Sequence, residues 1–213
     1  MLYKHIIWDW NGTLLDDVEE SIATINLLLK KRKLKPIASK QDYQNMFCFP
    51  VIDYYQKLGF DFNIESFQNV ADEYIDIYLK EAKKAQLNKD AIKILKLFQD
   101  LKIKQTIVSA SSQPILNQQI EQFKISGYFE QVLGINNNLA TSKVALAKKY
   151  FQEADLNSKE VLLIGDTLHD YQVAKELNCK AILVACGHQS KEIISECDQV
   201  VDNFDELLQL MVK

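Results

Sequence analysis

The side chains in this sequence that could do chemistry stand at the ends of short apolar segments. Asp9 directly follows one such segment, Ser109 follows a second, and Asp166 follows a third after a single glycine. A buried carboxylate costs free energy unless a cation or hydrogen-bond donors meet it. Two carboxylates that point into one crevice repel each other, and hard oxygen ligands of this kind favour Mg²⁺ between them.

Two further features would complete a site around these carboxylates. Ser109 offers a hydroxyl group beside the free N–H groups of a predicted helix start, and together these can bind a phosphate. Lys143 begins a later predicted helix and could neutralise a phosphate dianion. Taken alone, Ser109 could be a helix cap, Asp166 could belong to an acidic first helical turn, and Lys143 could be a surface lysine. Their order along the chain favours a phosphoryl-transfer site that works by positioning and electrostatics.

The elements that must position these residues alternate along most of the chain. Apolar runs predict strands and periodic apolar spacing predicts helices. The strands are expected at 3–8, 103–108, 131–134, 161–164 and 181–184. The helices are expected at 91–101, 114–123, 142–152 and 203–211, and a further helix follows Asp166 and ends at residue 177. This alternation predicts an α/β fold with a doubly wound parallel sheet. Ligands of such sheets bind beyond the carboxyl ends of the strands.

The segment between the first strand and residue 87 has a different texture. Periodic apolar residues predict long helices at 17–33 and 64–85, and two shorter helices split by Pro50 within 40–59. No strand is expected there. We therefore expect an all-helical insertion, a cap domain at 16–87, in a core formed by 1–15 and 88–213. The alternative at the insertion's start is a hairpin, because Asn-Gly at 11–12 is a strong hairpin signal.

Composition excludes several classes of protein. The 213 residues include 25 basic and 29 acidic ones, so the net charge of −4 argues against a general nucleic-acid binder. The four cysteines have no metal-site spacing. Neither a secretion signal nor an apolar run of membrane-spanning length is present in the sequence. We expect a cytoplasmic protein without a membrane partner, and the sequence leaves monomer and homodimer open.

The motifs resemble those of the haloacid dehalogenase superfamily of phosphohydrolases. The family's first motif, D-x-D-x-T, is similar to Asp9-Trp-Asn-Gly-Thr13, and its second, a strand ending in Ser or Thr, is similar to the segment ending at Ser109. The family's third motif is a lysine that is usually followed by proline; Lys143 corresponds to it, but no proline follows. The fourth, G-D-x-x-x-D, matches 165–170 in full. The C-terminal part also resembles phosphoglycolate-phosphatase-like members.

The resemblance implies a Rossmann-like core with a small helical cap, and a role for each matching residue. Asp9 would attack phosphorus and form an aspartyl-phosphate, with a small phosphorylated metabolite as substrate. Mg²⁺ would be held by Asp9, the main-chain carbonyl of Asn11 and Asp166. Asp170 would orient the lysine or a water. The phosphate-binding residues would be Thr13, Ser109, Ala110 and Lys143.

Asn11 departs from the family pattern. Phosphatases of the family have a second Asp there, which protonates the leaving group, and an amide cannot transfer that proton. Three explanations compete: a substrate with a good leaving group, a proton from Asp16, His169 or His188, or a catalytically weak phosphate-binding or regulatory module. His169 is expected to be exposed on a helix, and His188, near a strand end, is the better histidine candidate.

The predicted cap offers little to bind a second anionic group. We expect hinges of the cap near residues 16–18 and 84–88. Arg32 is the only arginine in the chain, and it lies roughly 20 Å along a helix from the first hinge, at the helix rise per residue. We therefore expect Arg32 to lie outside the site. The aromatic segment 47–50 is expected in the cap core, with a loop that faces the substrate as the alternative.

Overall fold

The computed structural model describes residues 3–140 and 142–212, and its centre is a parallel sheet. Six strands lie in the order β5-β4-β1-β6-β7-β8, and every neighbouring pair is parallel. Their bounds are β1 His5–Trp8, β4 Lys104–Ser112, β5 Gln131–Ile135, β6 Val161–Gly165, β7 Lys180–Val184 and β8 Val200–Val201. The predicted doubly wound α/β fold is confirmed.

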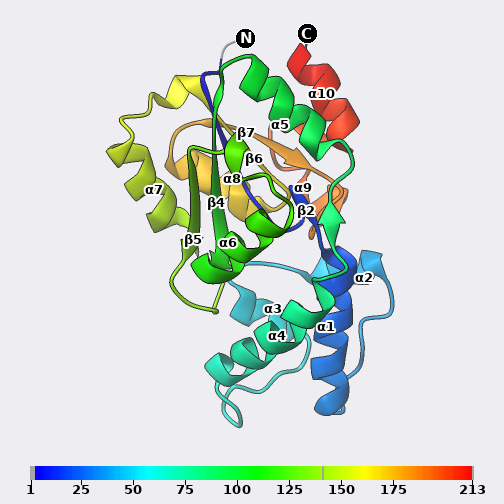
Figure 1. Ribbon diagram of the computed structural model, residues 1–213. Coiled ribbons are helices and arrows are strands. Elements are labelled where there is room, and N and C mark those ends of the chain that lie inside the picture. Colours follow the sequence, from blue (N-terminus) through cyan, green and yellow to red (C-terminus); the bar gives the residue numbers. More distant parts are fainter. Residues whose placement is uncertain (1–2, 141, 213) are drawn as a thin grey trace.

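Helices cover both faces of the sheet because its strands are apolar on both faces. On one face Ile6 and Trp8 pack against α5 (Ala91–Asp100), α6 (Gln113–Gln122) and α10 (Phe204–Val212). On the other face Ile7 packs against α7 (Val144–Glu153) and α8 (Leu168–Glu176). Figure 1 shows α5 and α10 side by side, with α7 on the opposite side of the sheet. These two layers fix β1 at the centre of the sheet.

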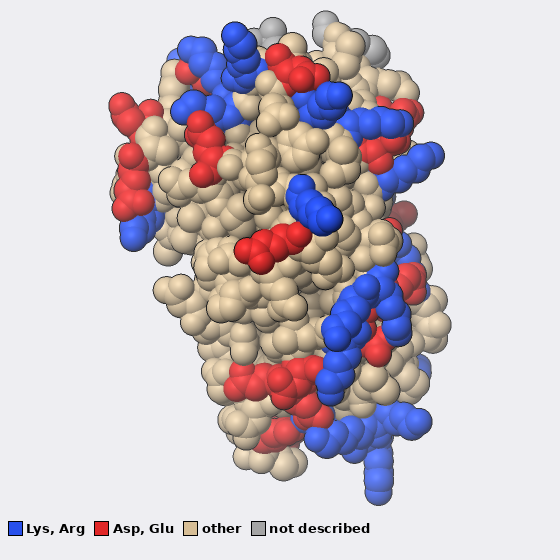
Figure 2. Space-filling view, in the orientation of Figure 1, with Lys and Arg blue, Asp and Glu red and all other residues tan. Residues whose placement is uncertain are grey.

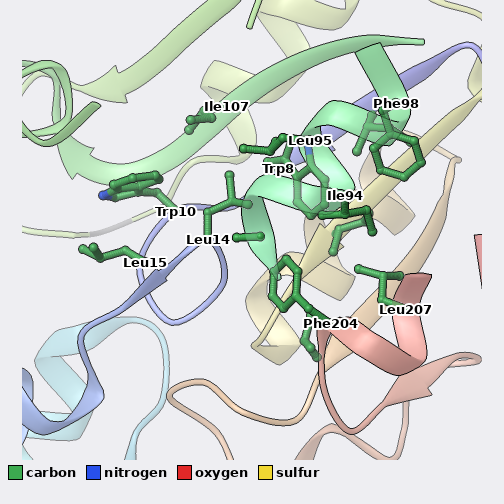
Figure 3. Close-up of a cluster of buried hydrophobic side chains, with 14 of the residues drawn as sticks. Trp8, Trp10, Leu14, Leu15, Ile94, Leu95, Phe98, Ile107, Phe204 and Leu207 are labelled. Carbon is green, nitrogen blue, oxygen red and sulfur yellow. The ribbon is translucent and has the colours of Figure 1, made fainter. Parts of the chain in front are cut away.

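The larger core cluster supports the end of β1. Figure 3 shows the indole of Trp8 among Phe98 of α5 and Phe204 of α10. The Trp8 Nε1–H donates to the side chain of Gln105 at 3.0 Å, so the one polar atom of this buried ring is satisfied. Because Trp8 is fully buried and held from both sides, the carboxylate that follows it in the chain has a fixed starting point.

Four helices in the lower part of Figure 1 share a hydrophobic cluster of their own. They are α1 (Val18–Lys31), α2 (Lys40–Met46), α3 (Val51–Lys57) and α4 (Phe67–Glu81). The predicted split at Pro50 is confirmed. The cluster includes Val18, Ile25, Leu28, Leu29, Tyr43, Tyr54, Tyr55, Phe60 and Val70.

The expectation that no strand lies between β1 and residue 87 is wrong. Two short strands, β2 (Leu15–Asp16) and β3 (Gln86–Leu87), pair antiparallel where the chain enters and leaves the four helices. Two residues are too few to produce a periodic pattern, and the pairing joins segments far apart in sequence. The sequence also missed α9 (Lys191–Ile194) and the short edge strand β8.

The hairpin alternative at Asn11-Gly12 is also excluded. Gly12 has a φ of +72°, and the chain turns there so that the N–H groups of Thr13 and Leu15 both donate to the carbonyl of Trp10. The turn carries the chain from β1 to β2 without pairing the two strands.

Charge is mixed over the surface. Figure 2 shows lysine and arginine side chains interspersed with acidic ones on this face, with stretches of uncharged surface between them. Within the described part of the chain, no helix is both long and apolar enough to cross a membrane.

Candidate active site

Three carboxylates converge at the carboxyl edge of the sheet. Asp9 follows β1, Asp166 follows β6, and Asp170 lies in the first turn of α8. Oxygen atoms of the three lie within 4.8 Å of one another, and all three residues are buried. Each is placed by an element of the core, because parallel strands end at the same edge.

Mutual repulsion and burial dominate the electrostatics of this cluster. Burial, together with the Asp9 and Asp170 charges, raises the pKa of Asp166 well above its ordinary value. Burial and Asp170 raise the pKa of Asp9 to about 6, although Lys143 acts in the opposite direction. Such a cluster of hard oxygen donors fits a divalent cation, because the cation relieves the repulsion. The donor set therefore suits Mg²⁺.

Lys143 supplies the cation within the cluster itself. Its ammonium group pairs with Asp9 Oδ1 and lies 2.6 Å from Asp170 Oδ1, and the side chain is 3 % exposed. Burial lowers the pKa of Lys143, but the two carboxylates outweigh it and raise the pKa above its ordinary value. For the same reason Lys143 holds the pKa of Asp170 below its ordinary value despite burial. The structure thus brings together the predicted Asp9, Lys143, Asp166 and Asp170.

The fourth motif fixes Asp170 through a capping box. The Asp170 carboxylate accepts from the N–H and the hydroxyl of Thr167, and Thr167 in turn caps the start of α8. A Cβ atom on Gly165 would lie 2.3 Å from the Asp170 side chain. A glycine is therefore required before Asp166 for α8 to approach the strand this closely.

Ser109 and Ala110 line the cavity next to Asp9, but not at a helix start as the sequence predicted. The strand β4 continues to Ser112 through a register shift between Val108 and Ser112, and α6 begins only at Gln113. A bulge of this kind re-aims side chains beside a site. Ser109 is buried and its Oγ accepts from the N–H of Ser111.

Thr13 lies behind the carboxylates rather than in the cavity. Its hydroxyl is fully buried, 3.0 Å from Asp166 Oδ1 and 3.4 Å from Asp9 Oδ2. Thr13 is not among the described residues that line the cavity. The geometry therefore gives this residue contacts with the acidic pair, whereas the resemblance implied contacts with phosphate.

The Asn11 side chain is fixed by three hydrogen bonds. Its amide nitrogen donates to Asp17 Oδ2 at 2.8 Å and reaches the hydroxyl of Tyr78 at 2.9 Å, while its oxygen accepts from Ser111 at 2.6 Å. Tyr78 also donates to Asp17 Oδ2, at 2.6 Å. An amide at position 11 thus complements the neighbouring carboxylate, which a second carboxylate would repel.

Asp17, rather than the predicted Asp16, is the acid at the entrance to the helical region. Asp16 is exposed on β2, whereas Asp17 is 1 % exposed and lines the cavity. The cause is strand alternation: Leu15 of β2 faces inward, so Asp16 faces out. Asp17 also accepts from the N–H of Gly12 at 2.9 Å. His188 opposes burial to hold the pKa of Asp17 below its ordinary value.

The two histidine candidates are both buried. His188 Nε2 lies 3.3 Å from Asp17 Oδ1, and Nδ1 lies 2.8 Å from the Tyr43 hydroxyl. Burial lowers the pKa of His188, but Asp17 outweighs it and raises the pKa to about 9. The expectation that His169 is exposed is wrong, because the ring of Phe49 stacks on it at 4.5 Å.

The cavity above Asp9 has a volume of about 140 Å³ and lies between the sheet edge and the four helices. Phe47 and Phe49 both line it, so segment 47–50 reaches the site. Phe47 also packs against the helical cluster, which shows that the two alternatives for this segment are both partly right.

Arg32 lies away from the cavity, as expected from its position in α1. Its guanidinium group pairs with Glu65 and Glu73 at 2.7 Å each, and neither glutamate lines the cavity.

Sequence reasoning missed Asp17, Tyr78 and Tyr43. One signal pointed to Asp17, because Asp is a preferred residue directly before a helix and α1 begins at Val18. The tyrosines gave no signal of their own, since aromatic residues at helical spacing most often form core. Only the packing of α2 and α4 onto the sheet edge brings their hydroxyls to His188 and Asp17.

The raised pKa of His188 predicts how stability depends on pH. The folded pKa of about 9 exceeds the ordinary 6.5, so the protonated ring stabilises the fold fully below pH 6.5, and this contribution is lost as pH rises through 9. We expect His188→Gln to cost about 3 kcal/mol more below pH 6.5 than above pH 9. Urea unfolding in EDTA at a series of pH values measures this. A destabilisation by His188→Gln that is constant with pH would contradict this prediction. In an Asp17→Asn background, the pH dependence of the His188→Gln effect should be weaker.

Comparison with known proteins agrees with this geometry. No curated protein sequence matches the chain. Three similar solved structures cover nearly the whole chain. A predicted phosphatase from Clostridium acetobutylicum shares 21% identity (TM-score 0.78), covering 100% of this chain and 99% of that one. A predicted phosphoglycolate phosphatase from Haemophilus somnus shares 18% (TM-score 0.73; 99% of each). Protein Tyrosine Kinase A from Mycobacterium tuberculosis shares 16% (TM-score 0.81; 98% of each).

At these identities the solved structures show a common fold. The family model described as haloacid dehalogenase-like hydrolase matches residues 6–184, which contain all four motifs and the carboxylate cluster. The chain therefore belongs to the haloacid dehalogenase-like hydrolase family.

Proposed function

We propose that the protein is a Mg²⁺-dependent phosphatase that acts on a small phosphorylated metabolite through an aspartyl-phosphate on Asp9. One observation carries the proposal: the Asp9 carboxylate faces a cavity between the sheet edge and the four helices, while Lys143, Asp166 and Asp170 surround it. Relatives of similar fold include predicted phosphatases, which agrees with this reaction class.

The chemistry takes two steps. In the first, an Asp9 oxygen attacks phosphorus, the bond from phosphorus to the leaving oxygen breaks, and that oxygen departs with the electron pair. In the second, water attacks the phosphorus, the bond to Asp9 breaks, and inorganic phosphate and the free carboxylate result. Lys143 binds the phosphoryl oxygens and orients Asp9, while Ser109 and the N–H of Ala110 bind the remaining oxygens.

Asp9, Asp166 and the main-chain carbonyl of Asn11 would hold the metal ion. Bound there, Mg²⁺ would polarise the phosphoryl group and offset the charge of the carboxylates. Thr13 fixes Asp9 and Asp166 relative to each other, and Asp170 holds Lys143.

Residues 16–87 would act as the cap. Hydrogen bonds join it to the core around the cavity: Gln44 Nε2 donates to the carbonyl of Gly187 at 2.7 Å, and Gln189 Nε2 donates to that of Phe47 at 3.0 Å. β2 and β3 pair at its base, where a hinge would lie. Closure of such a cap excludes water and adds its own residues to the site.

Hydrolysis of acetyl phosphate tests the proposal, because this substrate needs no proton on its leaving group. We expect Mg²⁺-dependent release of phosphate by the wild type, and a loss of at least about 10³-fold for Asp9→Asn. Asp16→Asn is the matched control, since it removes an exposed carboxylate on β2, and its activity should stay within twofold. Turnover without dependence on Asp9 would contradict the mechanism. Binding of phosphate without turnover would favour the phosphate-binding module.

The contacts of Asn11 predict the effect of restoring an acid. Asn11→Asp places a carboxylate beside Asp17, so the pair should share one proton. The double variant Asn11→Asp/Asp17→Asn exchanges the amide and the acid and keeps one of each. We expect the double variant to hydrolyse an alkyl monoester such as ethyl phosphate at least about 10-fold faster than wild type, with acetyl phosphate little changed. Equal effects on both substrates would contradict a proton-donor role for position 11.

A further inference from the structure

The wall of the cavity opposite Asp9 is apolar and aromatic. The helical region contributes Ile25, Phe47, Phe49, Phe67 and Ile75 to this wall. The volume of about 140 Å³ belongs to the whole cavity, whose other end is lined by Asp9, Ser109 and Lys143. The apolar wall suits the flat face of an aromatic ring attached to a phosphoryl group bound at Asp9.

Among the described residues, the cavity offers no free cation for a second anionic group. Of the described residues that line it, only Lys143 is a lysine or arginine, and Lys143 already faces two carboxylates. Both ring nitrogens of His188 are engaged, by Asp17 and by Tyr43. The His169 Nε2 accepts from the N–H of Lys143, and burial lowers the pKa of His169, which favours the neutral ring. A glycolate carboxylate would therefore be buried without a partner, which is costly.

The described residues of the cavity also leave no free proton donor for the leaving oxygen, because both ring nitrogens of His188 are already engaged by Asp17 and Tyr43. Asn11 cannot transfer a proton, and Asp17 accepts hydrogen bonds from Asn11, Tyr78 and Gly12. Asp16 is exposed and lies outside the cavity lining. A leaving group must then depart as an anion. Phenols have a pKa near 10, whereas alcohols resemble water, with a pKa of about 15.7.

One polar atom of the wall is also unpaired. The hydroxyl of Tyr54 is buried without a hydrogen-bond partner among the described residues, and Tyr54 lines the cavity. A buried hydroxyl without a partner costs free energy. A polar substituent on a bound ring could satisfy it.

We propose that the substrates are monophosphate esters of phenols, with the aromatic ring in the cap cavity and the phosphoryl group at Asp9. This inference rests on the proposed phosphatase activity and narrows it. The bond that breaks joins phosphorus to the phenolic oxygen. The phenolate leaves with the electron pair and takes its proton from solvent after release.

Four substrates separate the ring from the leaving group. Phenyl phosphate has both features, cyclohexyl phosphate has a ring of similar size with a poor leaving group, acetyl phosphate has a good leaving group without a ring, and 2-phosphoglycolate has neither. We expect kcat/KM for phenyl phosphate to exceed that for cyclohexyl phosphate and 2-phosphoglycolate by at least about 100-fold. Equal or better kcat/KM for either of these two would overturn the inference.

A matched pair of variants locates the ring. Ile75 lines the cavity and Ile64 is 85% exposed, so Ile75→Ala and Ile64→Ala delete the same atoms inside and outside the site. Ile75→Ala should lower kcat/KM for phenyl phosphate by roughly 5- to 10-fold. The same variant should leave acetyl phosphate within twofold, and Ile64→Ala should change neither. A loss on both substrates, or on neither, would contradict binding of the ring there.

A binding measurement keeps this inference separate from the proposed function. Phenylphosphonate and phosphonoacetate are titrated into wild-type protein with Mg²⁺ by calorimetry, and phenylphosphonate should bind at least about 10-fold more tightly. Asp9-dependent acetyl phosphate hydrolysis without this preference would refute the aromatic substrate and leave the phosphatase standing. The preference without any Asp9-dependent turnover would refute the phosphatase and, with it, the proposed substrates.

Discussion

The site depends on the crowding of three buried carboxylates around one lysine. Asp9, Asp166 and Asp170 are brought within a few ångströms by separate elements, and Lys143 alone can neutralise only part of their charge. In a medium of low polarity this arrangement costs free energy unless a cation and a phosphoryl group complete it. The surrounding core holds this arrangement in place: Trp8 packs against Phe98 of α5 and Phe204 of α10, and Gly165 allows α8 to approach β6 closely.

A second polar network lies where the helical region joins the core. Asp17 receives hydrogen bonds from Asn11, Gly12 and Tyr78 and pairs with His188, which in turn contacts Tyr43. Three elements far apart in sequence therefore meet at one carboxylate. The network explains why an amide is compatible with position 11, since a carboxylate there would face Asp17 at hydrogen-bonding distance. The same contacts link the position of the helices to the geometry of the cavity.

The two networks divide the proposed work of the protein. The carboxylate cluster with Lys143 and Ser109 would bind and transfer the phosphoryl group, and these residues belong to the family's shared motifs. The aromatic wall with the Asp17 network would decide which leaving group is accepted. The aromatic wall and the amide at position 11 favour the same kind of substrate. A phenol has a ring that can pack against the wall, and its phenolate can leave without a proton.

The sequence by itself determined the α/β fold and the grouping of Asp9, Lys143, Asp166 and Asp170, because apolar strands that end in polar residues must place them at one edge of a parallel sheet. Local patterns carry that information. Tertiary structure decided the rest. Leu15 faces inward on β2, so Asp17 lies in the site and Asp16 does not. Ser109 is presented by a bulge in β4 and not by the start of a helix. The ring of Phe49 stacks on His169 and buries it. Each of these depends on pairing or packing between segments distant in sequence, which no local spacing records.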